Sequence, residues 1–259
     1  MGYVLITGAT GGLGKEFCRQ LINTDDLFLT GRTQEKLLDL KAELLKINPS
    51  RKIEIYSADL TDFNQREELF CYIDKVGIKF SGLINVAGVD TQKEFLKYTH
   101  EKIVFQVRVN LEATLAITHA VLKRREKDLK ILTVSSISGT VPMPYFAIYS
   151  ATKASLINFF DALKSEVKDA KITTLLPGAI PTREDIKKDI LIQGWTGKAS
   201  AKSPEYVVKK GLKALNKNKR ICVPGAFNKF VCLIEKITPR KLRNAYIAKK
   251  WKNKEKDAF

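Results

Sequence analysis

The sequence predicts an α/β protein whose parallel sheet, of about seven strands, is covered by helices on both faces. Short apolar runs alternate with amphipathic segments from the first residues to about Pro224. Most of these runs are apolar at consecutive positions, which is typical of strands buried on both faces. A glycine-rich turn follows the first run directly. Together these observations predict a doubly wound sheet of strand–helix–strand units.

Seven runs are the predicted strands, at residues 3–7, 27–30, 53–57, 82–87, 130–135, 172–176 and 220–224. Amphipathic stretches such as 33–47 and 158–167 are the predicted helices. We find no linker or internal repeat and expect one domain over 1–225. Within it, 179–203 mixes Pro, Gly and charge, and we expect a lid there. Residues 226–259 are expected to form an apolar turn that ends at Pro239, followed by a basic helix whose far end is frayed.

The composition is strongly basic. Lys and Arg number 45 and Asp and Glu 28, so the formal net charge is +17. This excess favours acidic partners, such as anionic cofactors, acidic carrier proteins or membrane headgroups, but it also fits lysines spread over solvated helices. No nucleic-acid-binding motif is present, so we expect no nucleic-acid partner. No segment resembles a signal peptide or a membrane span, and we expect a cytoplasmic protein.

The four cysteines show no metal-binding spacing, and the chain has only two histidines. We therefore expect no metal site. The thiols are expected to be small buried hydrophobes in a reducing compartment, with Cys18 and Cys71 in the core.

The turn after the first strand reads "TGATGGLG" and opens a helix. Glycines such as Gly8, Gly12 and Gly14 let a pyrophosphate approach the backbone, and the helix N-terminus offers N–H donors. The spacing differs from the G-x-G-x-x-G fingerprint, and such turns also serve packing alone. Its place between strand and helix favours a Rossmann-type dinucleotide site.

The second strand ends in "LFLTGRTQ". A dinucleotide site that prefers NAD carries an acid near this position, for the ribose 2′-hydroxyl. Here Arg32 occupies the position, 18 residues after Gly14. Because a guanidinium suits a phosphate and Thr33 can add a hydroxyl, we predict NADP, with NADPH preferred over NADH.

With these features the chain resembles the short-chain dehydrogenase/reductase family over roughly residues 3–225. "TGATGGLG" resembles the family's glycine loop, "NVAG" (85–88) its N-x-A-G, and "PGAIPT" (177–182) its P-G-x-I-x-T. "YSATK" carries its Y-x-x-x-K, with Ser136 thirteen residues before Tyr149. The resemblance implies an NAD(P)-dependent enzyme that interconverts a carbonyl and a secondary alcohol.

The resemblance also implies roles. Tyr149 is the acid/base catalyst, Lys153 holds the nicotinamide ribose, Ser136 binds the reacting oxygen and Asn110 anchors a proton relay. Positions i and i+4 share a helix face, so Lys153 lies beside Tyr149, and its charge is expected to lower the pKa of the phenol. The predicted cofactor-binding residues are Thr7, Gly8, Thr10, Gly12, Leu13, Gly14, Arg32, Thr33, Asp59, Leu60, Asn85, Ala87, Gly88, Tyr149, Lys153, Pro177, Gly178, Ile180 and Thr182.

The substrate is expected to be a hydrophobic carbonyl or alcohol, such as a steroid or lipid, because the lid and the chain end supply apolar side chains. These side chains are Ile186, Ile190, Leu191, Ile192, Trp195, Phe227, Phe230, Val231, Leu233 and Ile234. The alternative is that they only cover the sheet. Two other functions stay open: a 3-oxoacyl carrier-protein reductase, and a non-catalytic NADP-binding regulator or scaffold.

The chain is expected to associate with other copies of itself, and its basic end offers a possible membrane contact. The resemblance implies a homodimer or homotetramer through helices around 111–125 and 150–168. The basic end of the chain, from Lys236 and including Leu242, Tyr246 and Trp251, either makes a weak contact with an anionic membrane or packs on the domain.

Overall fold

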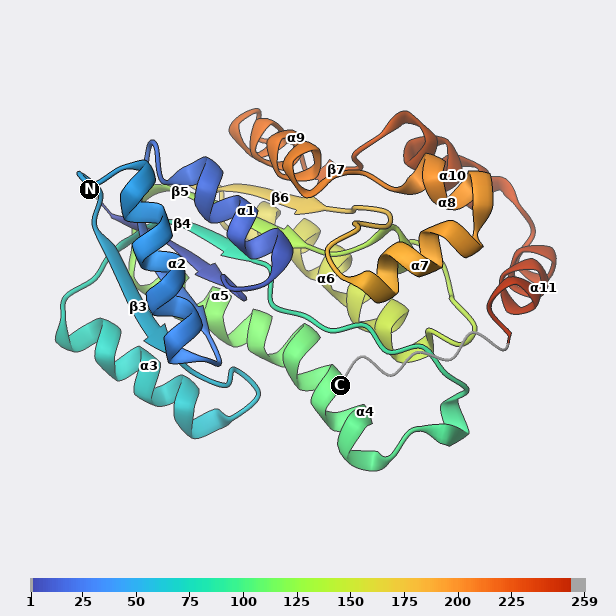
Figure 1. Ribbon diagram of the computed structural model, residues 1–259, viewed down its shortest axis with the longest axis horizontal. Helices are drawn as coiled ribbons and strands as arrows, with labels where there is room; N and C mark the ends of the chain where they lie inside the picture. The colour runs from blue at the N-terminus through green and yellow to red at the C-terminus, as the bar shows by residue number, and fades with distance from the viewer. Residues whose placement is uncertain (1, 253–259) are drawn as a thin grey trace.

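The computed structural model describes residues 2–252, apart from the side chains of residues 185 and 189. All seven predicted strands are present (Figure 1). They are β1 (Tyr3–Thr7), β2 (Asp26–Gly31), β3 (Ile53–Ser57), β4 (Phe80–Asn85), β5 (Arg125–Val134), β6 (Lys171–Leu175) and β7 (Ile221–Cys222).

Helices alternate with these strands and continue beyond them. They are α1 (Gly12–Leu21), α2 (Gln34–Ile47), α3 (Phe63–Lys75), α4 (His100–Val107), α5 (Ala113–Lys123), α6 (Ala147–Glu166), α7 (Glu184–Ile192), α8 (Gly194–Ser200), α9 (Pro204–Asn216), α10 (Ala226–Ile237) and α11 (Arg240–Trp251). Short 3₁₀ turns, η1 (Phe95–Lys97) and η3 (Ile137–Gly139), and a π-helical segment, η2 (Arg108–Glu112), join them.

The strands form one sheet in the order β3-β2-β1-β4-β5-β6-β7, and every neighbouring pair is parallel. The chain moves outward from β1 to β3 and then returns to β4 on the other side of β1. At this reversal the last residues of β1 and β4, Thr7 and Asn85, are register partners. In doubly wound sheets ligands bind in the crevice beyond the carboxyl ends of such strands.

The apolar runs are continuous because each face of the sheet has its own core. Val4 and Ile6 of β1 pack with α1, α2 and α9 on one face. Leu5 points to the other face and packs with α3, α5 and α6. Burying one such side chain fully contributes about 1.5–3 kcal/mol, so both helix layers are held by the strands between them.

Several element boundaries differ from the sequence expectation, and three of these differences have a clear structural cause. β4 ends at Asn85 because the N–H groups of Val86 and Ala87 leave the ladder and donate to Thr7 Oγ1. β5 begins at Arg125, since this residue pairs with Phe80 of β4 ahead of the mostly exposed polar stretch that follows. The apolar stretch after Gly225 is a full helix, α10, and not one turn. The end expected to fray includes 253–259, which lie outside the described residues.

The prediction that Cys71 is a core residue was wrong. Cys18 is buried in α1, but Cys71 is exposed on α3. The buried side of α3 is formed by Arg66, Leu69 and Ile73, and Cys71 falls between these positions. All four cysteines are free, and Cys222 and Cys232 are half-buried.

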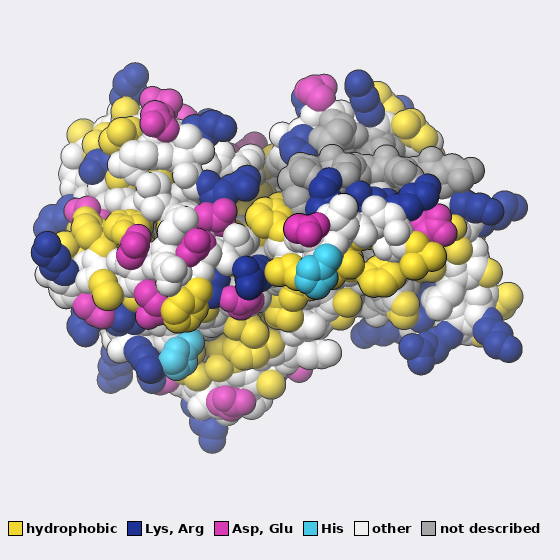
Figure 2. All heavy atoms as spheres, turned by 90° about the horizontal axis from the view of Figure 1, so that it is seen from below, with side chains coloured by type: hydrophobic (Ala, Val, Ile, Leu, Met, Phe, Trp, Pro, Cys, Tyr) yellow, Lys and Arg dark blue, Asp and Glu magenta, His cyan; other side chains and the backbone are white. Residues whose placement is uncertain are grey.

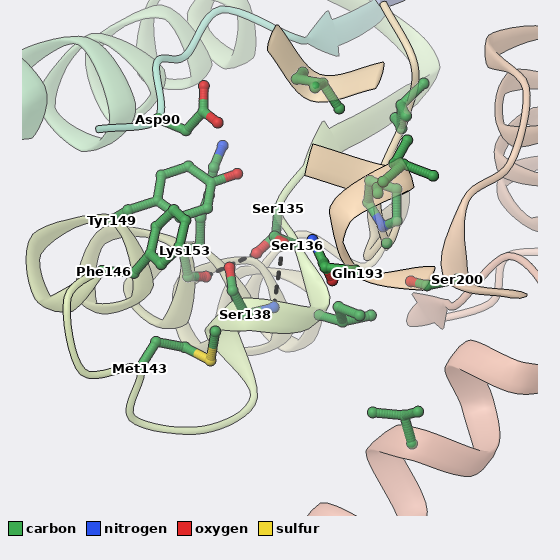
Figure 3. A pocket seen from close by; sticks show the side chains of 18 of the residues that line it. Asp90, Ser135, Ser136, Ser138, Met143, Phe146, Tyr149, Lys153, Gln193 and Ser200 are labelled. Atoms are coloured by element: carbon green, nitrogen blue, oxygen red, sulfur yellow. Dashed lines mark hydrogen bonds between the residues drawn. The ribbon is translucent and has the colours of Figure 1, made fainter. Parts of the chain in front are cut away.

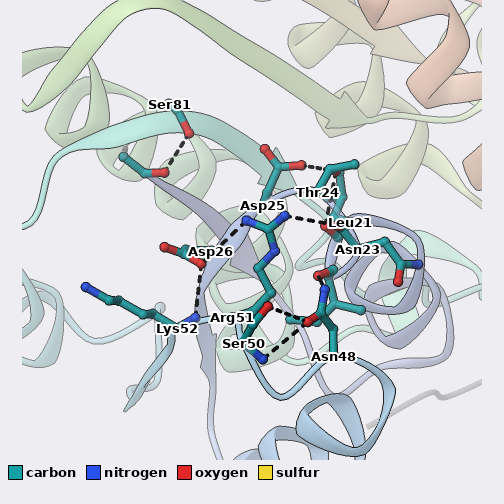
Figure 4. A network of polar contacts seen from close by, with 12 residues as sticks. Leu21, Asn23, Thr24, Asp25, Asp26, Asn48, Ser50, Arg51, Lys52 and Ser81 are labelled. Carbon is teal, nitrogen blue, oxygen red and sulfur yellow. Dashed lines mark hydrogen bonds and ion pairs between the residues drawn. The ribbon is translucent and has the colours of Figure 1, made fainter.

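A polar network closes the turns at the amino-terminal edge of the sheet (Figure 4). Arg51 Nη2 donates to the Asn23 carbonyl at 3.0 Å, and Asp26 Oδ1 accepts from the Lys52 N–H at 3.0 Å. The side chain of Asn48 donates to the Ile22 carbonyl and accepts from Ser50. The network ties the β1–β2 and β2–β3 connections together, at the edge opposite the crevice.

The surplus of positive charge is dispersed on the face seen in Figure 2. Lys and Arg side chains there are spread over both halves of the molecule, with Asp and Glu between them. Among the described residues no helix has the length and apolar character needed to cross a bilayer.

Candidate active site

The glycine loop leaves space for a phosphate. Gly8 has φ +61°, and a Cβ on Gly14 would lie 2.1 Å from the Gly8 carbonyl oxygen. Only glycine fits the second position without moving the turn. α1 starts directly after Gly11, whose position caps the helix without a side-chain bond. The exposed helix N–H groups and the bare backbone fit a dinucleotide pyrophosphate.

Arg32 lies beside this loop. It follows β2 directly and is exposed, and Thr33 occupies the N-cap position of α2 without a side-chain cap bond. The hydroxyl of Thr10 lies 3.3 Å from where a Cβ on Gly31 would stand, so the end of β2 touches the loop. Within the described part of the chain, Arg32 has no ion pair or hydrogen bond, and its guanidinium can meet a phosphate.

Asp59 lies further along the same edge, after β3. Its Oδ1 accepts from the Thr61 N–H at 2.9 Å and from the Thr61 hydroxyl at 2.8 Å. Leu60 is buried, and its carbonyl accepts from Arg66 at 2.7 Å. These bonds fix the turn and hold the Asp59 carboxylate half-buried at the edge of the sheet.

Asn85 holds the central strands together. Its Nδ2 donates to Thr118 and Thr133, both at 3.2 Å. The N–H groups of Val86 and Ala87 both donate to the Thr7 hydroxyl, which joins β4 to β1 at the crevice. The N-x-A-G segment therefore sets the path of the chain toward Gly88.

Asn110 fastens the loop after β4 to α6. It lies in η2, is fully buried, and exchanges two hydrogen bonds with the backbone of Val89, at 2.8 and 2.9 Å. Its Nδ2 also donates to Thr152 at 3.2 Å. A Cβ on Gly88 would lie 3.1 Å from Asn110 Oδ1 and 3.3 Å from Lys153 Nζ. The asparagine thus lies close to the lysine and positions the loop around it.

Tyr149 and Lys153 occupy the first two turns of α6, and Ser136 follows β5 (Figure 3). Lys153 Nζ lies 5.7 Å from the centre of the Tyr149 ring and donates to the Val134 carbonyl at 3.0 Å. Ser135 donates to the Lys153 carbonyl at 2.8 Å, which ties α6 to the end of β5. The fold brings the three predicted side chains to one wall.

Burial raises the pKa of the Tyr149 phenol above its ordinary value, and the Asp90 carboxylate raises it further. A hydrogen bond with Ser136 and the charge of Arg183 oppose this shift. The helix spacing predicted a lowered pKa; the direction is opposite because burial outweighs the neighbouring charges. Burial also lowers the pKa of Lys153 to about 8, and Asp90 opposes that shift.

A cavity of about 520 Å³ lies in front of this wall. Nine of the predicted site residues line it: Leu13, Gly88, Ser136, Tyr149, Lys153, Pro177, Gly178, Ile180 and Thr182. Arg32, Asp59 and the rest of the glycine loop do not; they lie at and beyond the β1 end of the same edge. The cavity therefore occupies one end of the crevice, and the glycine loop, Arg32 and Asp59 lie toward the other end.

The 179–203 segment and the C-terminal helices close the cavity. Ile186 and Ile190 of α7 and Phe227 and Val231 of α10 line it, as expected. Trp195, also expected in the pocket, is 73% exposed and is not one of the lining residues. Its indole lies edge-on against Phe227 at 5.4 Å, so it packs on the outside of the wall.

Several of the other expected apolar side chains also face solvent. Those that do not line the cavity and are exposed are Leu191, Ile192, Phe230, Leu233 and Ile234. Apolar composition identified the segments that wall the pocket, but it could not give the direction of each side chain.

Asp90 and Arg183 were not predicted from the sequence. Asp90 lines the cavity, and Arg183 forms an ion pair with it. Arg183 Nη2 lies 2.8 Å from Asp90 Oδ1, so an ion pair joins the loop after β4 to the start of α7. In Figure 3 the Asp90 carboxylate lies on the same side as the Tyr149 hydroxyl and the Lys153 ammonium. The only sequence signal is an acid two residues after the N-x-A-G segment.

Asn228 is a third residue that was not predicted. It is fully buried, donates to the carbonyls of Ser200 and Pro224, and accepts from the Ser200 hydroxyl at 2.8 Å. A Cβ on Gly178 would lie within 2.9 Å of its side chain. Asn228 thus joins the loop after β6, the end of α8 and the start of α10 around the cavity.

The family model for short chain dehydrogenase matches residues 2–189. Together with the parallel sheet, the glycine loop and the Tyr149–Lys153 wall, this match defines the class of protein. The chain belongs to the short-chain dehydrogenase/reductase family, whose members are NAD(P)-dependent oxidoreductases.

Curated relatives share part of their length with this chain. A very-long-chain 3-oxoacyl-CoA reductase of Laccaria bicolor is 34% identical over 181 residues, which cover 66% of this chain and 52% of that protein. An 11-beta-hydroxysteroid dehydrogenase-like 3 of Arabidopsis thaliana is 31% identical over 183 residues, 69% of this chain and 59% of that protein. The match thus spans about half the length of the reductase.

Solved structures share the fold. A structure titled for 7beta-hydroxysteroid dehydrogenase stereoselectivity has a TM-score of 0.82 and 23% identity, and covers 95% of this chain and 96% of its own. A short-chain dehydrogenase from Sphingobium yanoikuyae, in complex with NADPH, has a TM-score of 0.76 and 21% identity and covers 100% of both chains.

Proposed function

We propose that this chain is an NADP(H)-dependent oxidoreductase that interconverts a carbonyl and a secondary alcohol on a hydrophobic substrate. The observation that carries the proposal is the convergence of Ser136, Tyr149 and Lys153 on one cavity wall, within a largely apolar space of about 520 Å³. The glycine loop and Arg32, toward the other end of the same crevice, support the cofactor half of the proposal.

The residues of the crevice fit the cofactor. Gly8, Gly12 and Gly14 leave the backbone open to the pyrophosphate, Arg32 meets the 2′-phosphate, and Lys153 holds the nicotinamide ribose. A bound nicotinamide supplies the hydride for reduction, or accepts it for oxidation. The protein contributes position, a proton and the exclusion of water.

Tyr149 transfers the proton. Because its pKa is raised, the phenol is protonated at neutral pH and can donate to a carbonyl oxygen as that oxygen gains charge. The Ser136 hydroxyl binds the same oxygen, and the Lys153 ammonium stabilises negative charge that develops on the phenol. Oxidation needs the phenolate as the base, so at neutral pH the protonated phenol is ready for the reduction step.

The cofactor preference is tested at Arg32. In Arg32→Ala we expect kcat/KM for NADPH to fall about 10- to 100-fold, because charged hydrogen bonds to the 2′-phosphate are lost. With NADH the value should stay within about threefold, since the 2′-hydroxyl does not need the cation. Lys36→Ala, which removes an exposed charge from the first turn of α2, is the matched control. An unchanged ratio in Arg32→Ala contradicts the assignment.

Substitutions on α10 test whether the substrate binds in the cavity, because one side of this helix lines the cavity and another side faces solvent. Val231→Trp adds bulk inside the cavity, so we expect kcat/KM for a bulky ketone to fall about 10-fold or more, and that for a small ketone to change little. Leu233→Trp adds the same bulk on the exposed side of the helix and should change neither. Equal effects of the two variants on the bulky ketone would show that the substrate binds elsewhere.

Because the pKa of Lys153 is lowered, we expect cofactor binding to depend on pH. A lysine with a pKa of about 8 is charged below that pH, so its contribution to NADPH affinity is complete there. As pH rises above about 8, we expect the affinity to fall by up to about tenfold per unit. Fluorescence titration of NADPH at several pH values measures this slope. Lys153→Met should abolish the pH dependence. Lys209→Met, on the exposed side of α9, should retain it.

The whole proposal is tested by following NADPH and NADH oxidation against steroid ketones, aliphatic ketones and 3-oxoacyl thioesters. The names of the relatives favour two panel members, the 3-oxoacyl thioesters and the steroid ketones. Turnover that needs an acidic carrier protein supports a carrier-protein reductase instead. Tight NADPH binding without any turnover supports a cofactor-binding regulator.

A further inference from the structure

The outer side of α10 is apolar and faces solvent. Phe230, Leu233, Ile234 and Ile237 are 58%, 58%, 40% and 71% exposed. They occupy positions i, i+3, i+4 and i+7, and so form one stripe along the helix, here called the α10 stripe. Exposed apolar side chains are ordinary when scattered, but a stripe on one helix face is typical of a binding surface.

The rest of the structure holds α10 in this orientation. On the adjacent side of the helix, Phe227 and Val231 line the cavity. Asn228, fully buried, bonds to Ser200 and Pro224 as described above. The stripe therefore cannot turn inward unless the helix gives up these contacts and exposes the cavity wall.

The apolar surface continues onto α8, which lies beside α10 (Figure 1). Trp195 is 73% exposed and packs edge-on against Phe227 at 5.4 Å. Tryptophan is the residue most typical of the boundary between water and lipid, where its apolar ring and its N–H are both accommodated.

Positive charge accompanies this surface on α10 and on the chain that follows it. Between residues 221 and 252 the only acid is Glu235, which accepts from Thr140 at 3.2 Å. Lys229 and Lys236 are exposed on α10 itself. The Lys and Arg residues of this region are eight: Lys229, Lys236, Arg240, Lys241, Arg243, Lys249, Lys250 and Lys252.

We propose that the α10 stripe, with Trp195, docks this protein onto the surface of an anionic lipid membrane. An amphipathic helix in this position inserts its apolar side at the level of the headgroups, while the flanking lysines meet anionic lipids. A second copy of the chain fits less well, because a two-fold contact through this face would place its cations against one another. The inference does not depend on the reaction proposed above.

The surface differs from the one that the sequence suggested. The basic end of the chain, with Leu242, Tyr246 and Trp251, was expected either to make a weak membrane contact or to pack on the domain. In the structure Trp251 lines the cavity and packs edge-on against Phe146 at 5.2 Å. Leu242 and Tyr246 of α11 are 67% and 66% exposed. The proposal assigns the main lipid contact to α10, because four exposed apolar side chains share one face of that helix.

Vesicle flotation of the full chain tests the proposal. One set of vesicles is phosphatidylcholine alone, and the other adds about 30% phosphatidylserine. We expect binding to the anionic set, which weakens as salt rises from about 0.1 to 0.5 M. Leu233→Gln/Ile237→Gln should lower the partition coefficient at least about tenfold, and Lys229→Gln/Lys236→Gln about fivefold per charge.

Leu38→Gln/Ile47→Gln is the matched control, because it makes the same two changes at exposed positions of α2, at the other end of the molecule in Figure 1. Its binding should equal that of the wild type, and all variants should keep the wild-type melting temperature. Equal binding by the α10 and α2 variants overturns the proposal, as does the absence of vesicle binding by the folded wild type. A dimer that the α10 variant dissociates, without vesicle binding, assigns the stripe to a second copy instead.

Discussion

Tyr149→Phe should lower kcat by about 10²- to 10⁴-fold, the usual contribution of a general acid. The substitution keeps the ring that packs beside Phe146 and Lys153 and removes only the hydroxyl. We therefore expect KM and NADPH affinity to change by no more than a few-fold. Steady-state rates with the best panel substrate, together with a direct NADPH titration, measure both quantities.

Tyr145→Phe is the control, since it makes the same change four residues earlier. Among the described residues Tyr145 is not part of the cavity wall, and its role lies in its backbone, which has φ +67° and accepts from the Lys93 N–H at 3.0 Å. This variant should stay within about twofold of the wild type, as surface hydroxyls usually do. If Tyr149→Phe retained more than a tenth of the wild-type kcat, another group would be the acid.

The sheet was predictable because its burial leaves a simple pattern in the sequence. Strands covered on both faces must be apolar at successive positions, as in β1, where Leu5 and Ile6 enter different cores. The pattern fails where a strand leaves the core. The polar first half of β5 is mostly exposed and carries no such signal, although its first residue, Arg125, pairs with Phe80 of β4.

The pairing of Tyr149 with Lys153 in the cavity wall was predictable for a different reason. Tyr149 and Lys153 lie four residues apart on one helix, so local geometry alone places them together. Asp90 and Arg183 meet only because the fold brings the loop after β4 to the start of α7, and no spacing reports such a contact. The raised pKa of Tyr149 likewise depends on burial by distant segments, which the sequence does not give.

Gly14→Ala should have the second large effect, on cofactor binding. The new Cβ would lie 2.1 Å from the Gly8 carbonyl oxygen and 2.9 Å from Ala9 Cα, both of them backbone atoms, so the turn itself has to move. Because this backbone must approach the pyrophosphate, we expect NADPH affinity to fall about 10- to 100-fold. Overpacking should also cost about 1–3 kcal/mol of unfolding free energy, or a melting temperature lower by about 2–12 °C.

Gly77→Ala separates these two effects. Gly77 has φ +67°, and a Cβ added there would have no neighbouring atom within 4 Å, so alanine brings backbone strain of about 1–2 kcal/mol without any clash. Its melting temperature should fall much as that of Gly14→Ala does, while NADPH affinity stays unchanged. Both variants are compared by thermal unfolding and by NADPH titration. If Gly14→Ala bound NADPH as tightly as Gly77→Ala, the pyrophosphate would not lie over the glycine loop, because the turn that has to move would then make no contact with it.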